Sequence, residues 1–183
     1  MTENIMLDYA HLGPILTKLR KQKKKIVLTQ GSFDMIHIGH GRYLKKAKTF
    51  GDILIVGTDS DTKIRARKGK GRPVVPEDER LEMLTYLTPV DYVVLKPHPA
   101  PKWSLIKMIK PDILVATQET YHRDDLKKLK QFCGKVIVLE RMATTSTSAK
   151  LRRVQIGEAQ KIESKLTKRL IGTIEEVLSE FKQ

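Results

Sequence analysis

The sequence predicts an α/β fold, in which helices cover both faces of a five-stranded parallel sheet. Two observations favour this fold: short apolar runs of strand length recur along the chain, and a helical stretch fills each gap between them. The runs are residues 26–29, 53–57, 92–95, 113–116 and 136–139, and the stretches are 38–49, 77–87, 103–109 and 123–132. Strands that alternate with helices form parallel, Rossmann-like sheets that are buried on both faces.

Helical patterns flank this region on both sides and suggest three parts. A short amphipathic pattern precedes a basic run at residues 18–25, so we assign residues 1–24 to an N-terminal helical segment. Residues 25–155 form the α/β domain, and residues 156–183 form a C-terminal amphipathic helix. Its apolar side chains recur every three or four positions: Ile162, Leu166, Leu170, Ile174, Val177 or Leu178, and Phe181. This helix either packs on its own domain or forms a dimer contact.

The charge of the chain calls for an anionic partner. The 183 residues include 35 Lys and Arg against 21 Asp and Glu, which gives a net charge of +14. Nucleic acid, an acidic membrane face and a phosphate-rich substrate all suit this charge. Aromatic residues make up 5% of the chain, and this low share disfavours a protein that binds single strands by stacking.

Cysteine usage and hydropathy narrow the class of protein further. A lone cysteine, Cys133, excludes an internal disulfide framework and a cysteine-based zinc cluster. No apolar run reaches the roughly 18 to 20 residues that a membrane span needs. The first residues lack the basic-then-apolar order of a signal peptide, so we expect a cytoplasmic protein.

Unusual segments directly follow the predicted strands. Parallel sheets bind ligands beyond the carboxyl ends of their strands, where loops lead into helix N-termini. The segment between the first strand and its helix holds Gly31, which permits a sharp turn, and Gly39, where a side chain would block a ligand. His37 and His40 lie three residues apart, so both imidazoles project from one side of a helix start. This arrangement suits a phosphate group under nucleophilic attack.

Four motifs carry a resemblance to a known family. The segment Gly31-Ser32-Phe33-Asp34-Met35-Ile36-His37-Ile38-Gly39-His40 resembles the signature of the cytidylyltransferase-like nucleotidyltransferase superfamily. Residues 58–61 follow the second strand as they do in that family. Residues 68–73, Lys-Gly-Lys-Gly-Arg-Pro, resemble heptose-1-phosphate adenylyltransferases, and residues 141–148 resemble CTP-dependent cytidylyltransferases. The resemblance covers residues 24–154. Class I aminoacyl-tRNA synthetases share the His-Ile-Gly-His letters, but their Lys-Met-Ser-Lys-Ser loop is absent here.

The resemblance implies an enzyme that joins a nucleoside monophosphate from an NTP to a phosphorylated small molecule and releases pyrophosphate. It implies that His37, His40, Lys68 and Arg141 are catalytic. The nucleotide-binding residues are then Gly31, Ser32, Phe33, Asp34, Gly39, Ser146, Thr147 and Ser148, and the substrate-binding residues are Asp59, Arg72, Arg80 and Lys96. Mg²⁺ is expected with the bound NTP, and Asp34 orients either the loop or this ion.

The motifs leave two substrate classes open. The stretch at residues 68–73 favours ATP and a heptose-type sugar 1-phosphate, whereas Arg141 favours CTP and an alcohol phosphate such as glycerol 3-phosphate or phosphoethanolamine. A third alternative is a non-catalytic module that binds nucleic acid or an anionic membrane. We expect the partners to be ATP or CTP and a phosphorylated small molecule, with no requirement for nucleic acid, and a homodimer.

Overall fold

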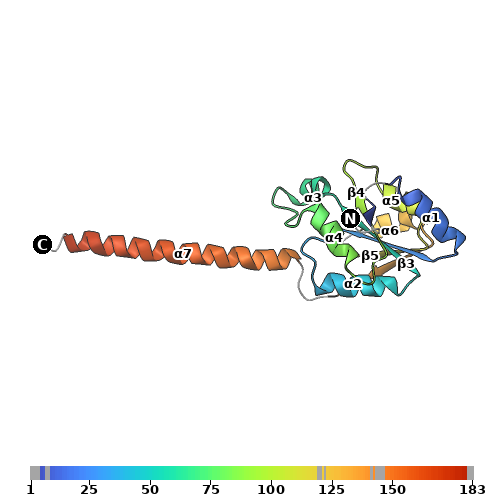
Figure 1. Ribbon diagram of the computed structural model, residues 1–183. Coiled ribbons are helices and arrows are strands. Elements are labelled where there is room, and N and C mark those ends of the chain that lie inside the picture. The colour runs from blue at the N-terminus through green and yellow to red at the C-terminus, as the bar shows by residue number, and fades with distance from the viewer. Residues whose placement is uncertain are drawn as a thin grey trace. The chain divides into compact units, whose positions relative to one another are not determined.

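The computed structural model describes residues 5–6, 9–118, 121, 123–140, 142 and 147–180 (Figure 1). The chain forms two compact units, Met1–Thr144 and Thr145–Gln183. The first unit holds the sheet and its helices, and the second holds one long helix. The predicted boundaries at residues 24 and 155 stay a prediction.

A parallel six-stranded sheet, in the order β1-β4-β3-β2-β5-β6, forms the centre of the first unit. The five predicted strands are confirmed, and a sixth, β1, pairs with β4 at the sheet edge. Two residues are too few to show a periodic pattern, which is why the sequence prediction missed β1. The strands are β1 (Ile5–Met6), β2 (Ile26–Gly31), β3 (Ile53–Asp59), β4 (Tyr92–Lys96), β5 (Ile113–Thr117) and β6 (Lys135–Leu139).

The predicted helices of the first unit are also confirmed, and three of them end one to three residues earlier than predicted. They are α1 (Leu12–Lys21), α2 (Ile38–Lys48), α4 (Glu77–Thr85), α5 (Ser104–Ile109) and α6 (Arg123–Leu129). A further helix, α3 (Asp61–Lys68), was not predicted. Its one buried side chain is Ile64, so this helix lacks the apolar periodicity on which the prediction depends.

Alternating side chains of the strands pack into two cores, one on each face of the sheet. Leu28 and Ile55 face a core that α1, α5 and α6 cover with apolar side chains such as Leu16 and Ile106. On the other face, side chains including Val27 and Val56 meet α2 and α4. The central strands are therefore buried on both sides, as their unbroken apolar runs predict.

Three aspartates hold the amino ends of the central strands in place. The Asp52 carboxylate accepts a hydrogen bond from the backbone N–H of Lys25 at 2.7 Å, and that of Asp112 accepts one from Ile26 at 2.7 Å. Asp91 accepts from the N–H of Leu54 at 2.6 Å. These bonds fix where β2 and β3 begin, so the carboxyl ends of both strands are fixed relative to each other.

The second unit contains α7 (Thr147–Glu180), a continuous helix of 34 residues. It begins nine residues before the predicted start at residue 156, because residues 147–155 continue the helical turn without a glycine or proline. In the described part of the chain, no helix has the length and apolar character needed to cross a membrane.

Candidate active site at the carboxyl ends of the strands

The two motif histidines lie together at the start of α2. His37 is the N-cap residue, and its Nδ1 accepts a hydrogen bond from the N–H of Gly39 at 3.0 Å. The N–H of His37 in turn donates to Nδ1 of His40 at 3.2 Å. The two imidazole centroids lie 4.1 Å apart. Reciprocal capping therefore fixes both rings on one side of a helix N-terminus, as the spacing in the sequence predicts.

These hydrogen bonds also assign the protonation of both rings. A neutral imidazole carries one hydrogen, and a nitrogen that accepts a hydrogen bond does not carry it. Because Nδ1 accepts in both residues, we assign the hydrogen to Nε2 in each. His37 and His40 thus carry one N–H donor each at a helix N-terminus, which is a suitable arrangement for an anionic oxygen.

The loop before these histidines has an unusual backbone conformation. Phe33 and Met35 have φ values of 47° and 50°, in the left-handed region that side chains other than glycine rarely adopt. A Cβ at Gly31 would lie 3.1 Å from the phenyl ring of Phe33, so any larger residue there would push this ring aside by a few tenths of an ångström. Such strain persists only where surrounding contacts determine it, and it is common at functional sites.

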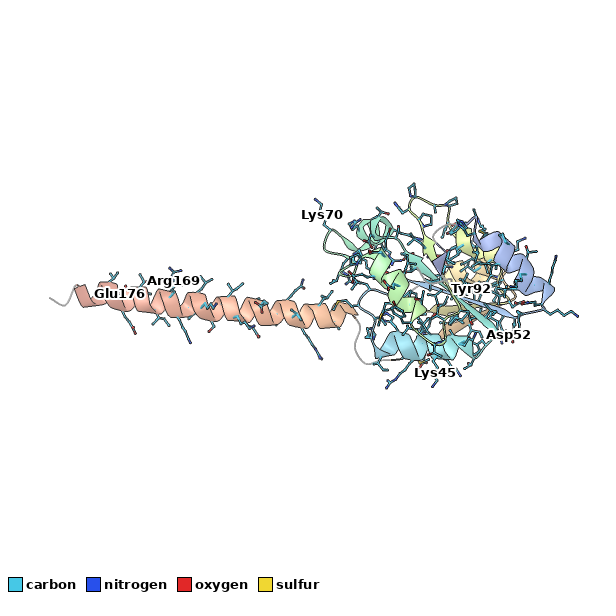
Figure 2. The ribbon with its side chains drawn as sticks, viewed as in Figure 1. Lys45, Asp52, Lys70, Tyr92, Arg169 and Glu176 are labelled. Atoms are coloured by element: carbon cyan, nitrogen blue, oxygen red, sulfur yellow. The ribbon has the colours of Figure 1, made fainter. Side chains whose placement is uncertain are left out.

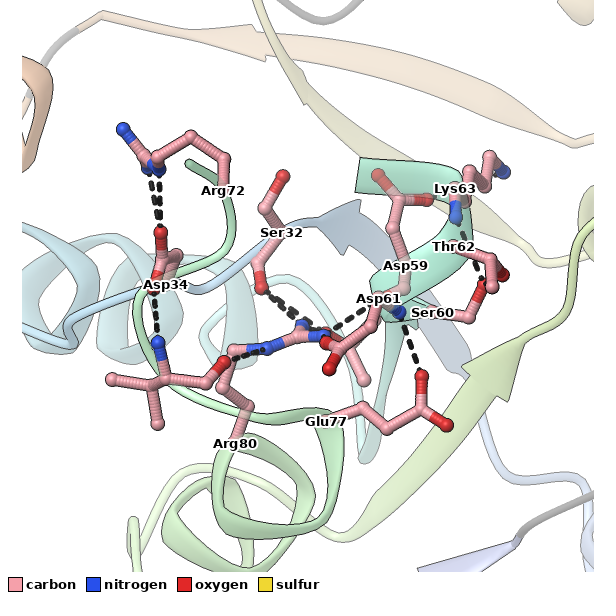
Figure 3. Close-up of polar contacts among 12 residues, drawn as sticks. Ser32, Asp34, Asp59, Ser60, Asp61, Thr62, Lys63, Arg72, Glu77 and Arg80 are labelled. Atoms are coloured by element: carbon pink, nitrogen blue, oxygen red, sulfur yellow. Dashed lines mark hydrogen bonds and ion pairs between the residues drawn. The ribbon is translucent and has the colours of Figure 1, made fainter. Parts of the chain in front are cut away.

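Asp34 supplies those contacts from inside the loop (Figure 3). Its carboxylate accepts hydrogen bonds from the N–H groups of Val74 and Val75, both at 3.0 Å, and it forms an ion pair with Arg72 at 2.7 Å. Burial alone would raise the pKa of Asp34, but the two N–H donors and Arg72 outweigh it and lower the pKa. Asp34 therefore joins the loop to the segment that follows α3.

Arg80 is fully buried between the loop and β3 (Figure 3). Its guanidinium donates to the carbonyl oxygens of Ser32 and Asp59 and to the carboxylate of Asp61, at 2.6, 2.9 and 2.7 Å. Two further bonds, to Val75 and Thr58, occupy its remaining N–H donors. Since all five donors bind the protein itself, Arg80 differs from the substrate contact that we predicted, and it holds the surrounding loops together.

Asp59, at the end of β3, is the centre of a basic cluster. Its carboxylate forms ion pairs with Lys63 at 3.2 Å, Arg67 at 3.0 Å and Lys96 at 2.9 Å. Burial alone would raise the pKa of Asp59, but Lys96 and Lys63 lower it. Burial lowers the pKa of Lys96 to about 8, because Asp59 opposes this shift only in part. We call Asp59, Lys63, Arg67 and Lys96 the Asp59 cluster. Because three cations share one carboxylate, the net charge of the cluster is positive.

Sequence reasoning missed two members of this cluster. Lys63 and Arg67 follow Asp59 by four and eight residues, and this spacing places all three on one side of the strand-to-helix segment. The signal was thus present in the sequence, but α3 itself was not predicted. Arg67 also donates to the hydroxyl of Ser32 at 2.8 Å and so connects the cluster to the histidine loop.

The remaining predicted residues fall in different places. Lys68 is exposed at the end of α3, where crowding by protein atoms and the charges of Arg67 and Arg72 lower its pKa. Arg141 and Ser146 lie outside the described residues. Thr147 and Ser148 begin α7, but their side chains are not described. The structure thus brings together the predicted residues up to Lys96 and leaves the 141–148 motif untested.

The described residues offer no cluster of three or more His, Cys, Asp or Glu side chains for a metal ion. One of the two roles predicted for Asp34 is to orient the Mg²⁺ ion. Its carboxylate instead pairs with Arg72 and accepts hydrogen bonds from the backbone N–H groups of Val74 and Val75. Of its two predicted roles, the structure supports the one in which Asp34 orients the loop.

The site combines paired histidines at a helix N-terminus with a basic cluster, both at the carboxyl ends of parallel strands. These features are typical of the class of α/β proteins that bind phosphorylated ligands. The family model described as cytidylyltransferase-like matches residues 28–166. The chain belongs to this family, which confirms the predicted resemblance.

Curated relatives agree with this assignment. The chain is 46% identical over 114 residues to the bifunctional protein HldE of Nitratiruptor, and these residues are 62% of this chain and 24% of that protein. It is 40% identical over 144 residues to HldE of Helicobacter pylori, covering 79% of this chain and 30% of that protein. The chain therefore spans about a quarter to a third of these relatives.

Two solved structures share the fold. A lipopolysaccharide core biosynthesis protein from Thermoplasma volcanium superposes with a TM-score of 0.57 at 29% identity, over 64% of this chain and 98% of that one. A pantoate-beta-alanine ligase from Francisella tularensis gives a TM-score of 0.59 at 19% identity, over 80% of this chain and 69% of that one. The first match omits about a third of the present chain.

Proposed function

We propose that this protein is a nucleotidyltransferase of the heptose-1-phosphate adenylyltransferase type. An oxygen of the acceptor phosphate attacks the α-phosphorus of ATP, and a new P–O bond forms. The bond from the α-phosphorus to the bridging oxygen of the β-phosphate breaks, and pyrophosphate leaves with its electron pair. No side chain becomes covalently bound, so the task of the protein is to position two anions and to offset their charge.

The histidine pair is the observation that carries this proposal. The Nε2 hydrogens of His37 and His40 contact oxygens of the α-phosphate, where negative charge rises in the transition state. Because reciprocal capping holds both rings, these donors need no reorganisation when the bond forms.

The Asp59 cluster is the proposed site of the acceptor phosphate. Its surplus positive charge lies at the ends of β3 and β4, and Arg67 connects it to Ser32 in the histidine loop. Asp59 itself serves as the anion that keeps Lys63, Arg67 and Lys96 together when no phosphate is bound. Lys68 and Arg141 contact the β- and γ-phosphates of the nucleotide.

Arg72 and Arg80 act indirectly in this scheme. Arg72 holds Asp34, and Arg80 joins the carbonyl oxygens of the histidine loop to the end of β3. Both are positioning residues. Mg²⁺ enters as part of the nucleotide substrate, with the phosphate oxygens as its main ligands.

ATP is favoured by the segment at residues 68–73 and by the identity to HldE proteins. CTP with an alcohol phosphate is the second candidate, and the motif that starts at Arg141 favours it. Both share the histidine site and differ in the base and the acceptor. The cytoplasmic location and the homodimer stay predictions.

Pyrophosphate release across four NTPs and a panel of phosphorylated acceptors tests the proposal. We expect ATP with a heptose-type sugar 1-phosphate to give the highest rate. CTP with glycerol 3-phosphate or phosphoethanolamine would support the second candidate, and no release with any pair would overturn both.

The role of the histidine pair has its own test. His40→Ala should lower kcat by about 10²- to 10³-fold, the usual effect of losing one transition-state donor. The matched control is His11→Ala, which removes an exposed imidazole at the N-cap of α1. Equal rates for His40→Ala and the control, with the melting temperature unchanged, would refute the assignment.

A further inference from the structure

The helix α7 exposes a row of apolar side chains along its length. Ile162, Leu166 and Leu170 are 59%, 57% and 63% exposed, and Ile174 and Val177 are similar. In the described part of the second unit, α7 has no other element to pack against. Amphipathic helices bury such a row against another surface.

The spacing of this row suits a second helix that runs along α7. Leu151 and Ile162 lie eleven residues apart, as do Ala159 and Leu170, and Leu166 and Val177. An eleven-residue repeat corresponds to about 3.67 residues per turn, close to the 3.6 of an ideal helix. The row therefore stays on one side of α7 over most of its length, about 50 Å at 1.5 Å per residue.

The charges at the two ends of α7 set the direction of such a partner. Its first turns carry Arg152 and Arg153, whereas its last turns carry Glu175 and Glu176. A parallel second copy would place like charges together at both ends. An antiparallel copy places the basic end beside the acidic end, which favours this orientation.

We propose that two copies of this chain associate through an antiparallel pair of α7 helices. With full overlap, Glu158 lies opposite Arg169 of the second copy, on the same flank of the apolar row. Ile162 packs next to Leu166. Glu163 of one chain lies near Glu163 of the other chain in both the parallel and the antiparallel pair, so this residue favours neither orientation. Figure 2 shows Arg169 and Glu176 projecting outward from α7.

The mass of the full-length protein in solution gives the first test. Size-exclusion chromatography with light scattering at micromolar concentration should give the mass of two chains. Leu166→Asp with Leu170→Asp should give the mass of one chain. The matched control, Ser164→Asp with Lys168→Asp, changes residues of the same helix outside the apolar row and should keep the double mass. A single-chain mass for the unaltered protein, or a double mass for the apolar variant, would overturn the proposal.

Cysteine cross-linking tests the orientation. Leu151→Cys and Val177→Cys chains, mixed and oxidised, should form a disulfide-linked heterodimer, because these positions are neighbours in the antiparallel pair. Val177→Cys alone should not cross-link, since its two copies lie about 40 Å apart along the axis at 1.5 Å per residue. The unaltered protein, whose Cys133 is buried, is the control for background. Efficient cross-linking of Val177→Cys alone would show a parallel pair and overturn the proposed orientation.

Discussion

Lys96 is the residue whose ionisation we expect to be visible in the kinetics. Its pKa is lowered to about 8 by burial, so the ammonium loses its proton as the pH rises through that value. The acceptor phosphate is then held less tightly. We predict that kcat/KM for the acceptor, measured at saturating NTP, falls up to tenfold per pH unit above this pKa.

The variant Lys96→Arg provides the control for this pH dependence. A guanidinium stays charged across the range, so the fall should disappear or move to higher pH. An unchanged profile in Lys96→Arg would contradict the role of Lys96. A fall in kcat/KM for the NTP of the same size would contradict the placement of the acceptor at the Asp59 cluster.

Arg80 is the residue on which we expect stability to depend most. Its five donors each bind an oxygen of the protein, and a lysine ammonium has only three donors. Arg80→Lys leaves buried acceptors without partners, and we predict a loss of about 2–4 kcal/mol in the free energy of unfolding. Urea unfolding measures it. Arg65→Lys, at an exposed position in α3, should change little.

At the residue scale, sequence could identify the histidines but not the role of Arg80. The spacing of His37 and His40 depends only on the local turn of a helix, so the motif predicts their arrangement. The oxygens that bind Arg80 belong to residues 32, 58, 59, 61 and 75, which only the fold brings together. From the sequence alone, an arginine within a ligand-binding motif is therefore predicted to contact the ligand. Only the fold shows which protein groups it binds instead.

Asp112 allows a test at the scale of one strand. Its carboxylate accepts the backbone N–H of Ile26, the first residue of β2, at 2.7 Å. Asp112→Leu removes the acceptor, and we predict that unfolding becomes easier by about 1–3 kcal/mol. Asp112→Asn keeps an acceptor oxygen and should retain most of the stability. Equal losses in chemical denaturation of both variants would contradict the strand-starting role.

Elements were predictable where burial imposes a pattern. The strands β2 to β5 are apolar because helices cover both faces of the sheet, and this burial is recorded in the sequence. Helix α3 is held instead by polar contacts: Ser60 accepts the N–H of Lys63, and Glu77 accepts that of Asp61. A helix that depends on such contacts has no apolar period to detect, and with it the cluster residues Lys63 and Arg67 were missed.

At the scale of the whole molecule, the net charge of +14 divides into several parts. The Asp59 cluster and the segment at residues 68–73 hold basic residues at the proposed phosphate sites. The first turns of α7 hold others, and the proposed antiparallel pair places them at the same end as Glu175 and Glu176 of the second copy. Under these two proposals the charge has partners in small phosphorylated substrates and in a second chain, so it is no argument for nucleic acid.

The two units should differ in how hydrogen exchange depends on protein concentration. Backbone amides of the central strands are protected by two cores within one chain, so their exchange should not change with concentration. A lone helix has only its own hydrogen bonds, whereas a paired α7 also buries its apolar row. Dilution separates the pair, and we predict that amides around Leu166 then exchange at least tenfold faster. Exchange measured by mass spectrometry at two concentrations checks this, and a concentration-independent rate in α7 would argue against association through this helix.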